Sequence, residues 1–158
     1  RYIRYKNLAT RLCVVDVENS AFYDAWRTGD LQVTAAGSRI EGIGRPRVEP
    51  SFVPGVIDHM VRVPDAASIA AAHVLSERLF RQIGGSTGTN FFGLCWIAAN
   101  MMQAGRPGSI VTLICDGGHR YTETFYNPGW LRDNGIDIDP YRRMLDRFLD
   151  HGEFLPPT

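Results

Sequence analysis

Residues 84–90 read Gly-Gly-Ser-Thr-Gly-Thr-Asn and stand just before a nearly all-apolar stretch, residues 91–104. Glycines let a backbone turn sharply and approach a ligand closely. A helix that starts here would present free N–H groups and its positive dipole end, which favour an anion or an electron-rich acceptor. No lysine follows the last glycine, so this is not a phosphate-binding loop of the Gly-x-x-x-x-Gly-Lys-Ser/Thr kind. Taken alone, the stretch favours a simpler interpretation, a Gly-rich connection whose Ser or Thr caps the helix.

Two further Gly-containing stretches accompany this one. Residues 40–44 read Ile-Glu-Gly-Ile-Gly, and residues 110–121 read Ile-Val-Thr-Leu-Ile-Cys-Asp-Gly-Gly-His-Arg-Tyr. The two glycines of the first stretch would let its backbone lie flat against a planar ligand. The second stretch begins as an apolar run typical of a buried strand and ends in a turn. Ligands of open α/β sheets bind at such carboxyl ends of strands.

The order of these three motifs resembles the C-terminal half of the pyridoxal-phosphate enzymes of fold type II, and most closely the cysteine synthase (O-acetylserine sulfhydrylase) and cystathionine β-synthase family. The resemblance covers residues 1–126. It implies an α/β fold, a three-layer sandwich with a mainly parallel sheet like that of the tryptophan synthase β subunit. It also implies pyridoxal 5′-phosphate as cofactor, a small amino acid as substrate and a homodimer. Residues 127–158 would be a helical extension that serves docking or dimer contacts.

The resemblance also implies which residues form the site. Cofactor contacts would come from Gly85, Ser86, Thr87 and Asp116. The substrate side would be lined by Gly42, Ile43, Gly44 and Tyr121.

Ser86 is the most informative of these residues, because in the resembled family the first hydroxyl of this loop hydrogen-bonds the pyridine nitrogen of the cofactor. A neutral hydroxyl does not stabilise a protonated pyridinium as a carboxylate would, so loss of a leaving group from the β-carbon is favoured over transamination. The resemblance therefore implies β-elimination or β-replacement on cysteine or O-acetylserine-like amino acids, as in a cysteine synthase or an L-cysteine desulfhydrase of the actinobacterial type. The residues do not decide between the two. Thr87 and Thr89 are expected mainly to cap the following helix.

Lys6 is the only lysine, and the first residue is not a methionine. A pyridoxal-phosphate enzyme needs a lysine to hold the cofactor as a Schiff base. In the resembled family that lysine lies upstream, and the surroundings of Lys6 do not match it. We therefore expect the N-terminal half with this lysine to be missing, this chain to contain no catalytic residue, and the chain alone to be inactive.

Composition narrows the other possibilities. A chain of 158 residues suits one domain. Its 17 basic and 17 acidic residues give a net charge of zero, so no electrostatic attraction to nucleic acid or anionic lipid is expected. No apolar stretch has the length of a membrane span and no signal peptide opens the chain, so we expect a cytoplasmic protein. The cysteines and histidines show no metal-ligand spacing, so no metal site is expected.

The alternative to a pyridoxal-phosphate enzyme is a non-catalytic α/β module that binds a nucleotide or cofactor, although no Gly-x-Gly-x-x-Gly follows the first strand.

The apolar patterns predict the elements that position these motifs. Residues 12–17 and 110–115 are expected to be parallel strands of one sheet, and residues 60–63 a short strand.

Helices are predicted at residues 66–81, with Asp65 as N-cap, and at residues 91–102, which are apolar almost all round. His73 is expected to be a partly exposed surface histidine rather than a base. In the tail, a helix is predicted at residues 140–150.

Overall fold

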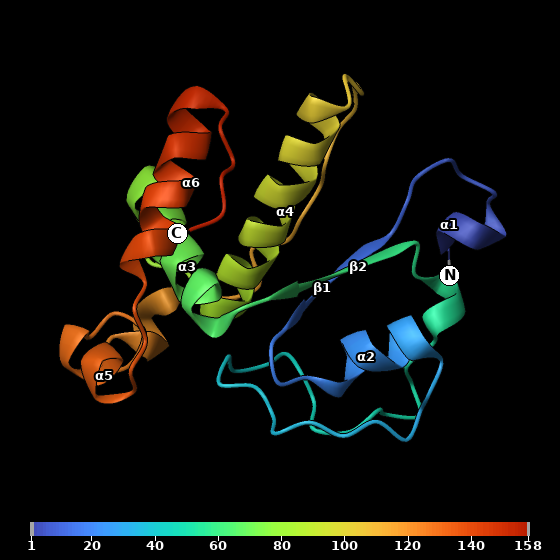
Figure 1. Cartoon of the computed structure of the whole chain (residues 1–158), viewed down its shortest axis with the longest axis horizontal. Helices are drawn as coiled ribbons and strands as arrows, with labels where there is room; N and C mark the ends of the chain where they lie inside the picture. Colours follow the sequence, from blue (N-terminus) through green and yellow to red (C-terminus); the bar gives the residue numbers. More distant parts are fainter. Residues whose placement is uncertain (1, 158) are drawn as a thin grey trace. The chain divides into compact units, whose positions relative to one another are not determined.

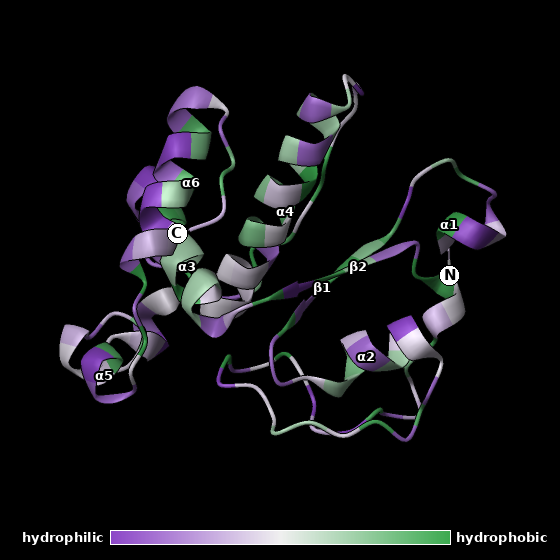
Figure 2. Cartoon of the chain, in the orientation of Figure 1, coloured by the Kyte–Doolittle hydropathy of each residue, from purple (hydrophilic) through white to green (hydrophobic). Residues whose placement is uncertain are grey.

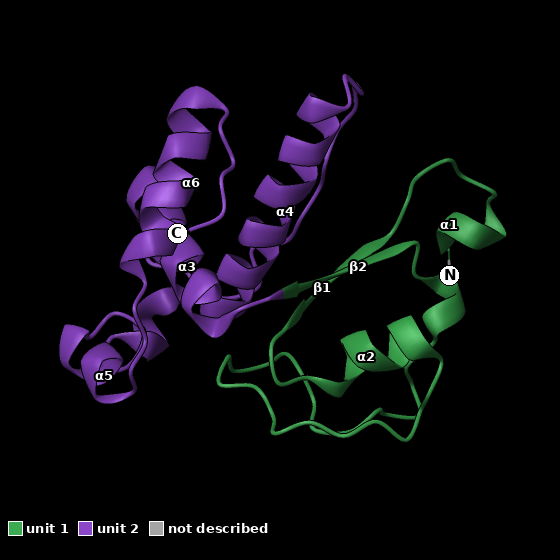
Figure 3. Cartoon of the chain, in the orientation of Figure 1, with its two compact units in different colours: residues 1–62 green, residues 63–158 purple. Residues whose placement is uncertain are grey.

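In a computed structural model the chain forms two compact units, unit 1 from Arg1 to Arg62 and unit 2 from Val63 to Thr158 (Figure 3). The structure describes residues 2–157. The sequence predicted another boundary, after residue 126, between a catalytic part and a helical extension. These compact units do not test that boundary, which stays a prediction.

Unit 1 contains a small parallel sheet. Its elements are α1 (Tyr2–Tyr5), β1 (Cys13–Val17), α2 (Ala21–Thr28), the 3-10 helix η1 (Pro54–Val56) and β2 (His59–Val63), the last residue of which opens unit 2 (Figure 1). The Leu12 carbonyl accepts hydrogen bonds from the backbone N–H groups of Asp58 and His59. The two strands therefore start side by side and run parallel, as β-branched, half-buried segments joined by a long crossover do.

Local caps fix α2 after β1. The Ser20 Oγ accepts from the Phe22 N–H at the start of α2, and Gly29 ends the helix in the left-handed conformation at φ 78°. Asp16, at the end of β1, accepts from the Tyr23 N–H at 3.0 Å. Burial raises the pKa of Asp16, against hydrogen bonds from Ser20 and the backbone that lower it.

Unit 2 is built of helices around α3 and α4. Its elements are α3 (Asp65–Leu79), α4 (Gly85–Gln103), the 3-10 helix η2 (Gly118–Tyr121), α5 (Pro128–Asp133) and α6 (Asp139–His151), and both α4 and α6 pack on α3. Figure 2 shows hydrophilic and hydrophobic bands alternating along α6, whose Met144, Leu145 and Phe148 are buried. An amphipathic helix of this kind is held by its apolar face.

Small residues let α3 and α4 approach closely. Ala67, Ser68 and Ala72 of α3 are fully buried. A Cβ placed on Gly88 of α4 would lie 2.1 Å from the Ser68 carbonyl oxygen and 2.7 Å from the Ala72 nitrogen. Gly88 is therefore required for helix packing.

Residues 110–115 are not a strand, so the prediction that they form a parallel strand in the same sheet as residues 12–17 is wrong. The segment is without regular structure, and β1 pairs with β2 instead. A strand exists only where a neighbour takes its backbone N–H and C=O groups, and among the described residues no backbone group bonds the backbone of residues 110–114. Val111 is 90% exposed and Leu113 is 71% exposed.

Two helix starts also differ from prediction. Helix α4 begins at Gly85, six residues before the predicted start at 91, because the Gly-Ser-Thr stretch packs on α3 and is helical despite its glycines. Its N-cap is Gly84, which makes no side-chain bond, so the expected Thr caps are absent. Asp65 is the first residue of α3, with Pro64 in the N-cap position. None of the helices formed by the described residues is long and apolar enough to cross a membrane.

Candidate functional site

The hydroxyl side chains at the start of α4 are buried, and two of the three bond to the chain itself. Thr89 Oγ1 donates to Ser68 Oγ at 2.9 Å and also lies 3.2 Å from the Gly85 carbonyl. Thr87 Oγ1 accepts from the Cys115 N–H at 2.9 Å. Both threonines therefore fix the position of α4 against its neighbours in unit 2.

Ser86 differs from these threonines. Its side chain is only 8% exposed, and its hydroxyl makes no hydrogen bond to any residue that the structure describes. The hydroxyl oxygen is not fully enclosed, so water or a ligand atom can accept from it. Ser86 is thus available to an acceptor brought by a ligand.

Residues 82–88 lie directly against residues 115–118. The Gly84 N–H donates to the Asp116 carbonyl at 3.1 Å, and the Gly118 N–H donates to the Gln82 carbonyl at 3.0 Å. A Cβ on Gly84 would stand 1.8 Å from Asp116 Oδ1, and one on Gly118 would stand 2.7 Å from the backbone of Ile83. The two motifs therefore touch because both supply glycine at the contact.

One of the two oxygens of the Asp116 carboxylate accepts a hydrogen bond within the described residues. Asp116 Oδ2 accepts from the Tyr121 hydroxyl at 2.8 Å, while Oδ1 is buried without a hydrogen-bond partner among the described residues. Tyr121 is 5% exposed, and its ring stacks on Phe125 with centroids 5.0 Å apart. A buried carboxylate oxygen without a donor is uncommon and marks a place where a ligand donor or a water would bind.

The predicted substrate-side glycines belong to unit 1 and bend its loop after α2. Gly42 and Gly44 have φ angles of +87° and +73°, which favour glycine. A Cβ on Gly44 would stand 2.7 Å from Val17 Cγ2, so Gly44 is also needed for packing against the end of β1. Ile43 between them is half-buried.

The structure thus brings together five of the predicted site residues in unit 2: Gly85, Ser86, Thr87, Asp116 and Tyr121. It places the other three, Gly42, Ile43 and Gly44, in the bend of unit 1. Lys6 lies exposed in the turn after α1, also in unit 1, with its Nζ 5.3 Å from the centroid of the Tyr5 ring. Within the described residues no group of three or more His, Cys, Asp or Glu is placed to hold a metal ion.

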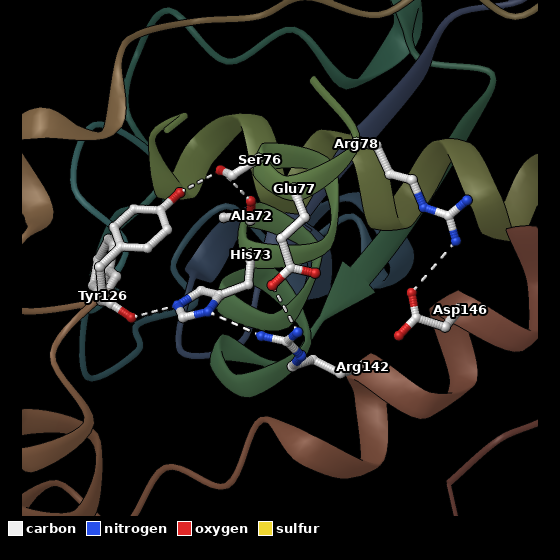
Figure 4. A network of polar contacts seen from close by, with 9 residues as sticks. Ala72, His73, Ser76, Glu77, Arg78, Tyr126, Arg142 and Asp146 are labelled. Atoms are coloured by element: carbon white, nitrogen blue, oxygen red, sulfur yellow. Dashed lines mark hydrogen bonds and ion pairs between the residues drawn. The ribbon is translucent and has the colours of Figure 1, made fainter. Parts of the chain in front are cut away.

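Sequence analysis missed a polar network beside this cluster, which Figure 4 shows in close-up. The Tyr126 hydroxyl donates to the Ile83 carbonyl at 2.7 Å and lies 2.7 Å from Ser76 Oγ. His73 is half-buried and stacks on the Tyr126 ring with centroids 4.7 Å apart. Burial raises the pKa of Tyr126 and lowers the pKa of His73. No sequence pattern singled out Tyr126, because its partners are some 40 to 50 positions away in the chain.

Individual relatives, rather than a family model, show which family the chain belongs to. No family model matches the chain. Over 138 residues the chain is 56% identical to an L-cysteine desulfhydrase of Mycobacterium tuberculosis, covering 87% of this chain and 38% of that protein. It is 27% identical over 146 residues to a cysteine synthase of Dictyostelium discoideum, covering 87% of this chain and 38% of that protein. A putative pyridoxal-phosphate dependent protein of Caenorhabditis elegans is 30% identical over 176 residues, which cover 96% of this chain and 40% of that protein.

A solved structure supports the fold. The cysteine synthase of Entamoeba histolytica matches with a TM-score of 0.63 at 19% identity, over 94% of this chain and 40% of the other. The α/β class predicted from the sequence is therefore confirmed, and residues 2–157 hold a two-stranded piece of sheet. The chain spans 38% of the length of the desulfhydrase and of the Dictyostelium synthase. It belongs to the family of cysteine synthases and L-cysteine desulfhydrases, the fold type II pyridoxal-phosphate enzymes that its three motifs resemble.

Proposed function

We propose that this chain supplies the ring-binding side of the active site in a pyridoxal-phosphate-dependent enzyme that acts on cysteine or O-acetylserine-like amino acids by β-elimination or β-replacement. The observation that carries the proposal is the hydroxyl of Ser86, a residue only 8% exposed, which makes no hydrogen bond among the described residues while the other hydroxyls of the loop are bonded within the chain. The 56% identity to an L-cysteine desulfhydrase favours release of sulfide from cysteine over the synthase reaction. It likewise speaks against a non-catalytic binding module.

The residues present fit one side of the cofactor. Ser86 would donate its hydroxyl hydrogen to the ring nitrogen, which satisfies the hydroxyl and keeps the nitrogen unprotonated. When bound, pyridoxal 5′-phosphate withdraws electrons from the substrate α-carbon, so that a group on the β-carbon can leave. A neutral partner at the ring nitrogen limits this withdrawal and disfavours competing transamination.

The rest of the loop holds Ser86 in place. Thr87 is tied to the backbone of Cys115, and Gly84 is tied to the backbone of Asp116. Asp116 Oδ1, beside Gly84, would take a donor from the cofactor, the substrate or a bound water. Gly42, Ile43, Gly44 and Tyr121 are proposed for the substrate side.

The remaining parts of the enzyme are proposed to lie outside this chain. Lys6 is exposed and far in sequence from the Ser86 loop, so the lysine that holds the cofactor would come from an N-terminal half. Val111 and Leu113 have exposed apolar side chains, and among the described residues their backbone makes no backbone–backbone hydrogen bond, so this segment would fit beside a strand of that half. Residues 127–158 would serve docking or dimer contacts in a cytoplasmic homodimer.

Two measurements on the intact protein test the proposal. The protein as purified should absorb near the edge of the visible range and release sulfide from cysteine. Ser86→Ala should keep the cofactor but lower turnover by roughly one to two orders of magnitude, because losing the partner of a buried acceptor costs about 1–3 kcal/mol. The control is Ser51→Ala, an exposed serine of unit 1, which should turn over like the wild type. Full turnover in Ser86→Ala would contradict the placement of the ring nitrogen.

A further inference from the structure

Both peptide groups of Ile83 are held by the side-chain network of Figure 4. The Ile83 carbonyl accepts from the Tyr126 hydroxyl at 2.7 Å, and the Ile83 N–H reaches Ser76 Oγ at 3.1 Å and the Tyr126 oxygen at 3.2 Å. Ser76 Oγ in turn donates to the Ala72 carbonyl one turn earlier in α3, at 2.6 Å. Ile83 is fully buried, so water does not replace these partners.

Ile83 stands directly before Gly84 and three residues before Ser86. Between Ile83 and Ser86 the backbone is held by further hydrogen bonds: the Gly84 N–H donates to the Asp116 carbonyl, and the Gly84 and Gly85 carbonyls accept from the Gly88 N–H and from Thr89 Oγ1. A shift of the Ile83 peptide would therefore be passed to the first turn of α4. Tyr126, which lies in the turn after η2, thus contacts the residue from which the chain enters the first turn of α4.

Tyr126 is itself held by His73. The two rings stack with an interplanar angle of 17°, and His73 Nε2 lies 2.7 Å from the Phe125 carbonyl oxygen. A carbonyl only accepts, so Nε2 carries a hydrogen. On the other side of the ring, Arg142 Nη1 of α6 lies 3.3 Å from Nδ1. A guanidinium only donates, so Nδ1 must be without a hydrogen, and His73 is neutral in this arrangement.

We propose that Tyr126 is a positioning residue for Ser86, and that neutral His73 links it to α6 through Arg142, so that protonating His73 loosens the start of α4. The meaning of this link for catalysis rests on the proposed cofactor role of Ser86. The link itself is a property of the fold.

The charges around His73 set the direction of the pH effect. Arg142 from α6 faces Nδ1, and Glu77 from α3 accepts from the same guanidinium at 2.7 Å. The Tyr126 ring and the Phe125 carbonyl cover the remaining sides. Burial, and then the charge of Arg142, hold the pKa of His73 below its ordinary 6.5, against the Phe125 carbonyl and Glu77, which raise it. Protonation would place a hydrogen on Nδ1, so that two donors and two positive charges, the imidazolium and the Arg142 guanidinium, would face each other. This repulsion would separate His73 from Arg142.

Amide hydrogen exchange on the intact protein tests the link without using activity. Tyr126→Phe keeps the ring and removes the hydroxyl, so the Ile83 carbonyl loses its donor. We expect exchange in the peptide that covers residues 82–88 to be on the order of tenfold faster, while exchange in β1 and β2 stays unchanged. Unchanged exchange over residues 82–88 in Tyr126→Phe would overturn the proposal.

A second hydrogen-exchange experiment tests the pH dependence with His73→Gln, whose side-chain amide offers both a donor and an acceptor but does not titrate. In the wild type, exchange over residues 82–88, divided by the intrinsic rate at each pH, should rise as the pH falls from about 7 to about 5. In His73→Gln it should stay flat. The same rise in both proteins would overturn the role of His73.

Two arginines of α6 provide a matched pair that does not disturb the core. Arg142→Gln should speed exchange over residues 82–88, because Arg142 touches His73. Arg147→Gln should not, because Arg147 pairs with Glu153 at the surface. Equal effects of the two variants would overturn the link to α6. A wild type without cofactor would refute the proposed function alone, since every readout here is independent of the cofactor.

Discussion

Gly88 of α4 faces the backbone of α3, and Gly88→Ala adds a single methyl group at that contact. The new Cβ would stand 2.1 Å from the Ser68 carbonyl oxygen, 2.7 Å from the Ala72 nitrogen and 2.9 Å from the Ala72 Cβ. Two of these three neighbours are backbone atoms of a buried helix, so no side chain can rotate out of the way. The start of α4 would have to move away from α3 by roughly 1 Å to restore an ordinary contact.

Two opposing terms set the size of the effect. Alanine is favoured over glycine in a helix by about 1 kcal/mol, which would stabilise the variant. Overpacking a tight core usually costs about 1–3 kcal/mol and sometimes more, and a clash with backbone belongs at the upper end. The displaced α4 would also weaken the bond of Thr89 to Ser68. We therefore expect Gly88→Ala to lower the free energy of unfolding by about 2 kcal/mol.

The assay is urea unfolding of the intact protein, followed by circular dichroism, with Gly108→Ala as the matched control. A Cβ on Gly108 would meet only the terminal methyl of Met101 at 2.9 Å, which can swing aside. Gly108 does not need a positive φ, so its variant should unfold within about 0.5 kcal/mol of the wild type. If Gly88→Ala is as stable as Gly108→Ala, the close approach of α3 and α4 is not what requires the glycine.

Two further outcomes are expected. Asn127 caps α5 by accepting from the N–H groups of Gly129 and Trp130, so Asn127→Ala should cost about 1 kcal/mol in the same urea assay, and no loss would show that the cap is not needed. A limiting amount of a thiol reagent at neutral pH should label exposed Cys115 before Cys95, because burial raises the pKa of Cys95 to about 12. Mass spectrometry of the digested protein would read the order, and earlier labelling of Cys95 would contradict the burial.

The elements that rest on local patterns were predicted well. The helix expected at residues 66–81 is α3, Asp65–Leu79, and the strands expected at residues 12–17 and 60–63 are β1, Cys13–Val17, and β2, His59–Val63. Apolar spacing and β-branched runs carry this information within a few neighbouring residues. The ends differ by one or two positions, where capping and tertiary contacts decide.

What the sequence could not supply depends on partners distant in the chain. Residues 110–115 have the composition of a buried strand, yet among the described residues no strand pairs with their backbone, and Val111 is 90% exposed. The apolar composition suits a strand that is buried between neighbours, and the described residues provide no neighbouring strand for it. The glycines of residues 84–90 were interpreted as letting the backbone approach a ligand, but a Cβ on Gly84 would instead meet the Asp116 carboxylate of the chain itself.

The Gly-Gly-Ser-Thr-Gly-Thr stretch shows how structure sharpens a chemical interpretation. From the sequence, each of its hydroxyls could bind a cofactor or cap a helix. In the folded chain Thr87 is tied to Cys115 and Thr89 to Ser68, so replacing either threonine would act first on stability. Ser86 has no such contact among the described residues, so its replacement should leave the fold and change the chemistry. Ser86 is therefore the residue of the loop that we propose for the cofactor, because its hydroxyl is the one that a ligand could take without breaking a bond inside the described chain.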